Sequence, residues 1–118
     1  MDIEGGDVFL ARFPHASGTR GKKRPVVVLQ TDAYNQRLRH AVVAQLTTNL
    51  SDQDDPACLL IEATSLEGKA AGWTKDSLFA GYLLSLMSED RLKDKIGRFP
   101  DETMRKANDC LQASLDSS

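Results

Sequence analysis

The chain has 118 residues, of which 41% are hydrophobic and 27% are charged, and this size and balance fit a single globular domain spanning residues 1–118. Its formal net charge of −2 excludes a protein that coats nucleic acid nonspecifically, because such binding needs a summed positive field. The acidic start MDIEGGDVF lacks the lysines of a signal peptide, and no apolar run approaches the ~20 residues of a membrane span, so we expect a soluble, cytoplasmic protein.

Six strands are expected along the chain. They cover residues 7–13, 25–31, 40–48, 57–63, 76–87 and 93–99. The first alternates its apolar residues after Gly5 and Gly6, which predicts a half-buried strand. The second is continuously apolar and should be covered on both faces, with Pro25 at its first position. The fifth should bend at Gly81.

One amphipathic helix is expected to close the chain. Apolar residues recur there at helical spacing, at Met104, Ala107, Leu111 and Leu115. Residues 100–102 are a proline and two acids, which suit the positive end of a helix dipole. Several short strands and one terminal helix indicate a mainly β fold with a C-terminal α-helix, built as a small, strongly curved sheet or barrel.

Three segments occur in a recognisable order: GDVF, then KRPVVVLQTDAYN, then VVAQLTTN. From about residue 6 to residue 115 the chain resembles the MazF/PemK (Kid-like) toxins of type II toxin–antitoxin systems. The resemblance implies a small SH3-like barrel of the MazF/PemK/CcdB type with a C-terminal helix, assembled as a homodimer. It also implies a metal-independent endoribonuclease that needs no cofactor, cleaves single-stranded RNA in the manner of an mRNA interferase, and is neutralised by a cognate antitoxin.

Arg24 and Thr47 are the candidate catalytic residues. Cutting RNA without a metal uses the 2′-hydroxyl as the nucleophile, so the protein must neutralise a crowded phosphorane, and the fork of Arg24 matches phosphate oxygens. Thr47 matches the family's catalytic threonine, with Thr48 as the alternate one residue on. The shared motif implies antiparallel pairing of strands 25–31 and 40–48, which would bring Arg24 and Thr47 together. An arginine before a strand is also common as a solvated edge charge, and a threonine as a β-former.

The loop of residues 15–23 reads HASGTRGKK. Its cations Arg20, Lys22 and Lys23 predict a flap that contacts RNA phosphates together with Thr48, although ordinary solvated charge has the same composition. His15 titrates near neutrality and is a candidate general base, although a histidine in a polar loop is also often incidental.

Five further residues have structural or open interpretations. Asp32 and Asn35 follow a strand, where such side chains cap turns. Trp73 could stack on a base, or pack in the core or an interface. Cys58 and Cys110 lie far apart and lack the paired spacing of a zinc site, which predicts reduced, structural thiols.

The strand of residues 76–87 departs from the family pattern. Many members carry an acidic residue and a nearby arginine there, and our alignment places Gly81 and Leu84 at those positions. Loss of a carboxylate that serves as general base removes a contribution of typically ~10²–10⁴-fold. Three interpretations stay open: an active endoribonuclease with another base, a noncatalytic toxin of the same fold that binds a protein target such as gyrase, and an inactive paralogue that only binds antitoxin.

Overall fold

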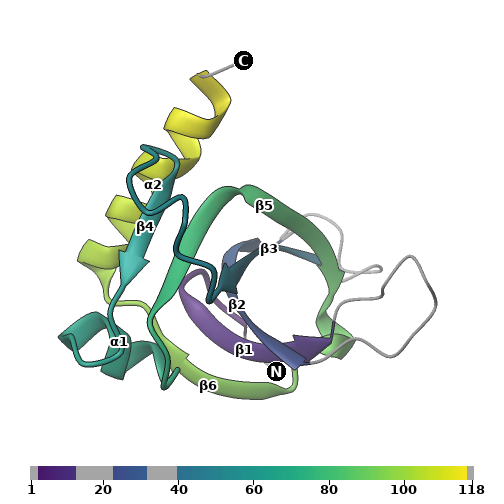
Figure 1. The fold of residues 1–118 in the computed structure, drawn as a ribbon. Helices are drawn as coiled ribbons and strands as arrows, with labels where there is room; N and C mark the ends of the chain where they lie inside the picture. The colour runs from purple at the N-terminus through teal and green to yellow at the C-terminus, as the bar shows by residue number, and fades with distance from the viewer. Residues whose placement is uncertain (1–2, 13–22, 32–39, 117–118) are drawn as a thin grey trace.

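The computed structural model describes residues 3–12, 23–31 and 40–116, whose strands form one antiparallel sheet in the order β4-β5-β3-β2-β1-β6. The strands and helices are β1 (Asp7–Arg12), β2 (Lys23–Thr31), β3 (His40–Thr47), β4 (Cys58–Ile61), α1 (Leu66–Ala71), β5 (Ser77–Ser88), the 3-10 turn η1 (Glu89–Arg91), β6 (Asp94–Arg98) and α2 (Asp101–Asp116). The sheet curls into a half-barrel, and α2 packs beside β4 and β5 (Figure 1). The expected mainly β fold with a C-terminal helix is confirmed.

Strand β2 is covered on both faces, as its continuous apolar run predicts. Val26, Val27 and Val28 are all fully buried. Val27 belongs to the helix-side core, the cluster that includes Ala107 of α2, whereas its two neighbours belong to the opposite core with Val43 of β3. Successive side chains of a strand point to opposite faces, so one strand supplies both cores.

Two expectations about the first two strands are wrong. Strand β1 is not half-buried: Val8 lies in the helix-side core, and Phe9 and Ala11 lie in the opposite core. It pairs with β2 on one side and β6 on the other, and both of its faces are covered. Pro25 is the third residue of β2, because pairing with β1 continues upstream to Lys23. The other expected strand ends agree to within two residues.

A buried carboxylate joins β1 to β6. The Asp7 side chain is only 2% exposed and accepts hydrogen bonds from the Arg98 guanidinium at 2.7 Å and from the Glu4 backbone N–H at 3.0 Å. The Lys95 ammonium lies 3.2 Å away. Burial alone would raise the pKa of this carboxyl, but the three donors outweigh it and hold the pKa below its usual range. Asp7 therefore stays charged inside the fold.

Helix α2 confirms the predicted terminal helix, and α1 is an element that the sequence analysis missed. Ser65 caps α1 by accepting the Gly68 backbone N–H at 3.0 Å, and Gly72 ends it with a left-handed φ of 76°. Both cap signals are present in the sequence, but they bracket a helix of only six residues, too short for an apolar period to show. No helix in the described ranges is both long and apolar enough to cross a bilayer.

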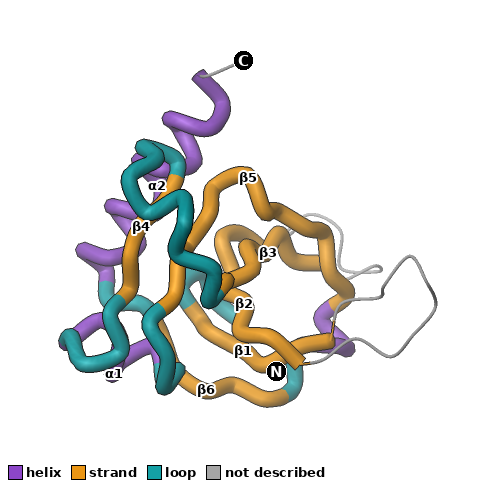
Figure 2. Tube along the Cα trace, in the orientation of Figure 1, coloured by secondary structure: helices purple, strands orange, loops and turns teal. Residues whose placement is uncertain are grey.

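Strand β5 is irregular where Gly81 lies. The register of β3 with β5 shifts between Ala44 and Leu46, and the surplus residues of β5, 80–83, include this glycine. The Gly81 N–H donates to the Ala57 carbonyl at 2.8 Å, so the strand turns towards β4 at this point. The tube in Figure 2 follows β5 along its curve to the short purple turn η1, after which the chain returns as β6.

The two cysteines are buried and unbridged, as expected for structural thiols. Burial raises the pKa of both Cys58 and Cys110, which keeps the thiols protonated. The Cys58 thiol donates to the Tyr82 hydroxyl at 3.7 Å, which in turn donates to Asp52 at 2.9 Å. This chain of contacts ties the acidic turn before β4 to the middle of β5.

Candidate active site at the ends of β2 and β3

Arg24 and Thr47 occupy matching positions on neighbouring strands. Strands β2 and β3 are antiparallel with Val26 opposite Gln45, and Arg24 and Thr47 each lie two residues further on. The expected antiparallel pairing is confirmed. Because side chains alternate, Arg24 projects on the face of Val26 and Thr47 on the face of Gln45, which is the face of the opposite core.

The Thr47 hydroxyl is oriented by the turn that follows β3. Its oxygen accepts the Asn49 backbone N–H at 3.1 Å, and the Asn49 side-chain oxygen accepts the Ser51 N–H at 3.1 Å. A hydroxyl that already accepts a hydrogen bond can still donate its own proton. The turn therefore leaves Thr47 able to donate to an anionic oxygen. Thr48, the alternate, is exposed and takes part in neither of these two hydrogen bonds.

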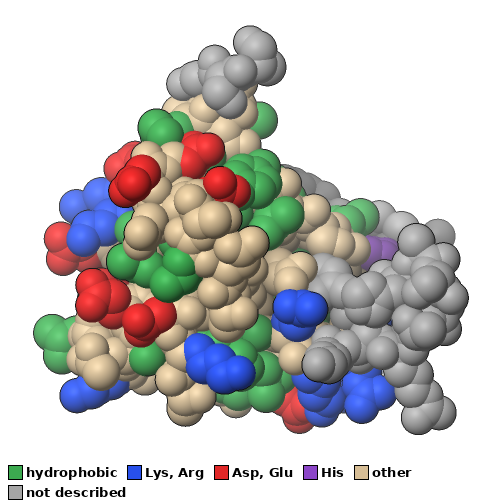
Figure 3. Space-filling view, viewed as in Figure 1, with side chains coloured by type: hydrophobic (Ala, Val, Ile, Leu, Met, Phe, Trp, Pro, Cys, Tyr) green, Lys and Arg blue, Asp and Glu red, His purple; other side chains and the backbone are tan. Residues whose placement is uncertain are grey.

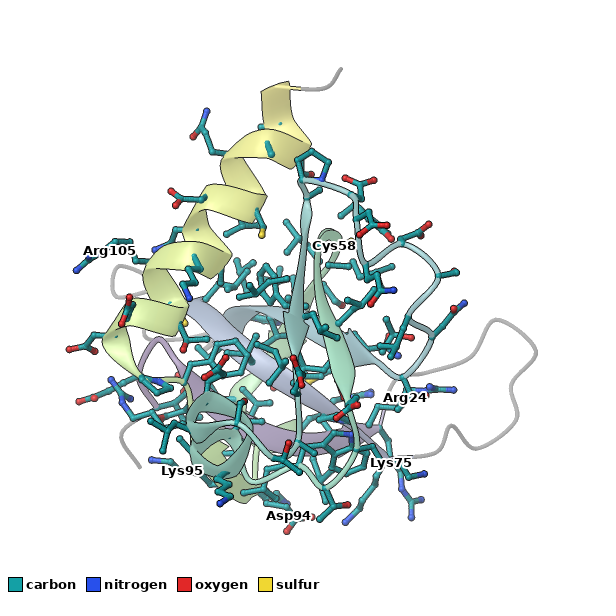
Figure 4. All side chains as sticks on the ribbon, turned by 60° about the vertical axis from the view of Figure 1, so that its left-hand side comes forward. Arg24, Cys58, Lys75, Asp94, Lys95 and Arg105 are labelled. Carbon is teal, nitrogen blue, oxygen red and sulfur yellow. The ribbon has the colours of Figure 1, made fainter. Side chains whose placement is uncertain are left out.

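Arg24 and Lys23 differ in what they contact. Arg24 is half-buried and makes no ion pair within the described residues, and Figure 4 shows its side chain extending away from the barrel at the strand end. The Lys23 ammonium, in contrast, lies 2.6 Å from the Asp94 carboxylate of β6. The Asp94 carboxylate thus balances the charge of Lys23, which was expected to contact RNA. Of the two neighbouring cations, Arg24 is the one left available for a phosphate.

Gly81 and Leu84, the positions aligned with the family's acidic residue and arginine, lie on the other face of the sheet. A Cβ added at Gly81 would stand 2.9 Å from the Cys110 carbonyl oxygen of α2, so no side chain fits there. Leu84 lines an apolar cavity with Leu111 of α2. A carboxylate at Gly81 would therefore point towards the helix and away from Arg24.

The remaining sequence candidates divide by whether they fall in the described part of the chain. His15, Arg20, Lys22, Asp32 and Asn35 lie outside the described residues. Trp73 is half-buried, and its indole N–H is buried without a hydrogen-bond partner in the described part of the chain. This environment favours a ring packed against the protein over one exposed for stacking on a base. Among the residues described, no group of three His, Cys, Asp or Glu could hold a metal ion.

Comparison with known proteins identifies the family of this chain. Residues 4–115 match the model of the PemK-like, MazF-like toxins of type II toxin–antitoxin systems. The chain belongs to this family. This toxin is 33% identical over 116 residues to the endoribonuclease EndoA of Bacillus subtilis, covering 98% of this chain and 96% of that protein. It is 29% identical to the endoribonuclease MazF of Staphylococcus saprophyticus, covering 93% and 88% of the two chains.

Solved structures show the same fold. The Mycobacterium tuberculosis toxin MazF-mt6 superposes with a TM-score of 0.71 at 16% identity, over 93% of this chain and 96% of that one. A mycobacterial endoribonuclease in complex with its cognate antitoxin superposes with a TM-score of 0.72 at 17% identity, over 99% and 98% of the two chains. The half-barrel with its terminal helix is thus the fold of this toxin family.

Two features of the site were not found from the sequence. Asn49 follows two threonines in an unremarkable polar stretch, and its part in orienting Thr47 depends on the turn geometry. Arg91 and Lys93 lie in the charged stretch EDRLKDK, which runs from η1 into β6 and for which the sequence analysis predicts only a strand from residue 93. Its density of basic and acidic residues is the signal that the sequence offers, but the position of Arg91 and Lys93 beside β1 follows only from the folded chain.

Proposed function

We propose that this toxin is an endoribonuclease that cleaves single-stranded RNA by attack of the 2′-hydroxyl on the adjacent phosphorus. The observation that carries the proposal is the placement of Arg24 and Thr47 on one face, at neighbouring strand ends. Relatives that are named endoribonucleases over nearly the whole chain support it.

In the proposed reaction the 2′-oxygen forms a bond to phosphorus as it loses its proton, and the bond from phosphorus to the 5′-oxygen breaks. The leaving 5′-oxygen takes up a proton, and the other product ends in a 2′,3′-cyclic phosphate. Arg24 pairs its guanidinium with the nonbridging oxygens, whose charge is greatest in the phosphorane. Thr47 donates its hydroxyl proton to the same phosphate and holds it in line.

The general base is the unassigned part of this mechanism. A carboxylate at Gly81 has no room and would face α2, so that position is not where the base stands in this chain. His15 is the candidate that the sequence offers, because imidazole titrates near neutrality. Replacing His15 by alanine should cost about 10²–10⁴-fold in rate and remove the dependence of rate on pH near 7 if it is the base. If His15→Ala leaves the rate unchanged, the proton of the 2′-hydroxyl is accepted by water or by another group.

We further propose that the toxin acts in the cytoplasm and is neutralised by a cognate antitoxin whose acidic segment covers the basic strand ends. Type II systems pair a toxin with an antitoxin, and a solved relative is held in such a complex. Carboxylates of a disordered segment would pair with Arg24 and its neighbouring cations. Affinity for the antitoxin should fall as the salt concentration is raised. An affinity that does not change with salt concentration would indicate that the antitoxin binds another surface.

A homodimer is the proposed assembly. A cavity of about 270 Å³ opens between α2 and the sheet, lined mainly by apolar side chains that include Leu29, Leu84 and Leu111. Leu84 and Leu86 of β5 are 45% and 66% exposed beside it. Exposed apolar surface of this kind marks an interaction site, and a second copy offers a matching patch.

The deciding experiment is incubation of the pure protein with mixed-sequence RNA in EDTA, followed by mapping of the ends produced. Cleavage that leaves 2′,3′-cyclic phosphate ends and is lost in Arg24→Ala supports the proposed reaction. A wild-type protein that cuts no RNA with or without added divalent metal would overturn it, and would favour a toxin that binds a protein target or a paralogue that only binds antitoxin.

A further inference from the structure

A cavity of about 250 Å³ lies at the end of β1, against the start of β2 and the link between β5 and β6. Its charged lining residues are Arg12, Lys23, Arg91, Lys93, Asp90 and Asp94. Four cations and two carboxylates surround a cavity in a chain whose net charge is −2. The local charge therefore opposes the overall charge, as expected for a site that attracts an anion.

The one ion pair inside the cavity leaves its net positive charge unchanged and shows which of the cations are unpaired. Lys23 and Asp94 are 2.6 Å apart and cancel one another. The other charged side chains that line the cavity are the cations Arg12, Arg91 and Lys93 and the carboxylate of Asp90. These three cations make no ion pair in the part of the chain that the structure describes. The Arg91 guanidinium donates a long hydrogen bond of 3.5 Å to the Arg12 carbonyl.

The cavity adjoins the candidate active site. Ala11 lines the cavity and is the partner of Arg24 in the β1–β2 register, and Lys23, which also lines it, is the residue directly before Arg24. Paired strands are about 4.8 Å apart and successive Cα atoms about 3.8 Å, so the two sites lie at one strand end, where Arg12 and Lys23 alternate onto the face opposite that of Arg24. Figure 3 shows Lys and Arg side chains gathered along the lower edge of this face, with acidic side chains among them.

We propose that this cavity binds a phosphate group of the RNA substrate next to the one that is cleaved. The inference rests on the proposed endoribonuclease function. Arg12 and Arg91 offer planar forks that match phosphate oxygens, and Lys93 adds a point charge. Because the cavity lies at the same strand end as Arg24, an RNA strand bound there by its scissile phosphate can bring a neighbouring phosphate round the strand end to the cavity, which favours RNA over an acidic protein segment as the ligand.

The test is the double variant Arg91→Ala/Lys93→Ala, with Arg105→Ala/Lys106→Ala as the matched control. The control removes the same kinds of charge from exposed positions of α2, and Figure 4 shows Arg105 on the side of the molecule away from Arg24. Binding is measured by fluorescence anisotropy on RNA whose 2′-hydroxyls are methylated, because this RNA cannot be cut. Circular dichroism melts check that each variant stays folded.

Relative to wild type, the cavity variant should bind this RNA about 10-fold more weakly and raise KM for cleavable RNA more than it lowers kcat. The slope of log affinity against log salt should fall by about 0.7, since the proposed site neutralises one phosphate and each neutralised phosphate of a single strand contributes about 0.7. Arg12→Ala should weaken binding in the same direction. The Arg105→Ala/Lys106→Ala control should leave affinity and salt slope at the wild-type values.

Three results would overturn the proposal. If the cavity variant matches its control in affinity and slope while wild type cuts RNA, the phosphate site is wrong and the endoribonuclease function stands. If the variant keeps its RNA affinity but loses binding to an acidic antitoxin peptide, the cavity serves the antitoxin. If wild type neither binds nor cuts RNA, both proposals fail together.

Discussion

Arg24 and Thr47 lie opposite one another on antiparallel strands, each two residues beyond the Val26–Gln45 pair and both on the face away from α2. One is held by the stiff start of a buried strand, and the other by a turn that uses its hydroxyl oxygen. A phosphate between them can receive a guanidinium fork from one side and a hydroxyl proton from the other. The following predictions depend on this relationship and on the contacts that support it.

Arg24→Ala should reduce RNA cleavage by about 10²–10³-fold, because a charge directed at a developing oxyanion contributes about that much to rate. Its melting temperature should stay near that of wild type, since a strand-end arginine without an ion pair contributes little to folding. Arg24→Lys should restore little activity, because an ammonium lacks the fork. Initial rates and thermal melts measure both effects, and a wild-type rate in Arg24→Ala would be decisive against this role.

Thr47→Val should slow cleavage by about 10- to 100-fold, the effect of removing one hydrogen bond to a charged group. Valine keeps the shape and the strand preference of threonine, so the change isolates the hydroxyl. Thr48→Val is the matched control, because Thr48 is adjacent but exposed and outside the hydrogen-bonded turn. If rate measurements show the larger loss in Thr48→Val, the catalytic hydroxyl has been assigned one residue too early.

Gly81→Asp should fail to raise activity and should destabilise the protein by about 1–3 kcal/mol. The new Cβ would stand 2.9 Å from the Cys110 carbonyl oxygen and 3.2 Å from the Ala57 carbonyl oxygen, both backbone atoms that cannot easily withdraw. Gly81→Ala separates the steric effect from the charge and should lose most of the same stability. Chemical denaturation measures the free energy of unfolding. A Gly81→Asp variant that is as stable as wild type and cleaves RNA faster would show that this position takes part in the reaction.

Asp7→Asn should lower the free energy of unfolding at pH 7 by about 1–3 kcal/mol, because it removes a charge that Arg98 and Lys95 contact. The folded-state pKa of Asp7 is depressed, so the ionised form is favoured by folding. Its contribution is complete above the unfolded value near 3.8 and is lost as the pH falls through the lower folded value. Denaturation from pH 7 to pH 2 should therefore show a smaller loss in Asp7→Asn than in wild type, with Asp54→Asn, an exposed acid, unchanged from wild type.

Leu84→Glu should convert the proposed dimer to a monomer at micromolar concentration, because it places a charge in the apolar surface beside α2. Leu66→Glu is the control, since Leu66 is 85% exposed on α1 and does not line this cavity. Light scattering gives the mass of each. A wild-type monomer, or a dimer that survives Leu84→Glu, would show that this surface does not hold two copies together.

Local pattern determined much of the fold. The run PVVVL gave a strand covered on both faces, and the spacing of Met104, Ala107 and Leu111 gave the terminal helix, because both periods follow from backbone geometry within one element. Arg24 and Thr47 could be proposed from motif resemblance before any contact was known. Half-burial of β1 was predicted wrongly, since its own alternation does not show that a core packs against each face of the sheet.

The tertiary structure alone decided what each candidate contacts. Lys23 pairs with Asp94, Gly81 faces a carbonyl of α2, and Arg91 and Lys93 reach the end of β1. Each of these contacts joins segments far apart in the chain, and it depends on strand register, on one bulge and on the path of the β5–β6 link. A shift of one residue in a strand exchanges its faces, so the surroundings of a side chain follow from the assembled sheet and not from the residues beside it in sequence.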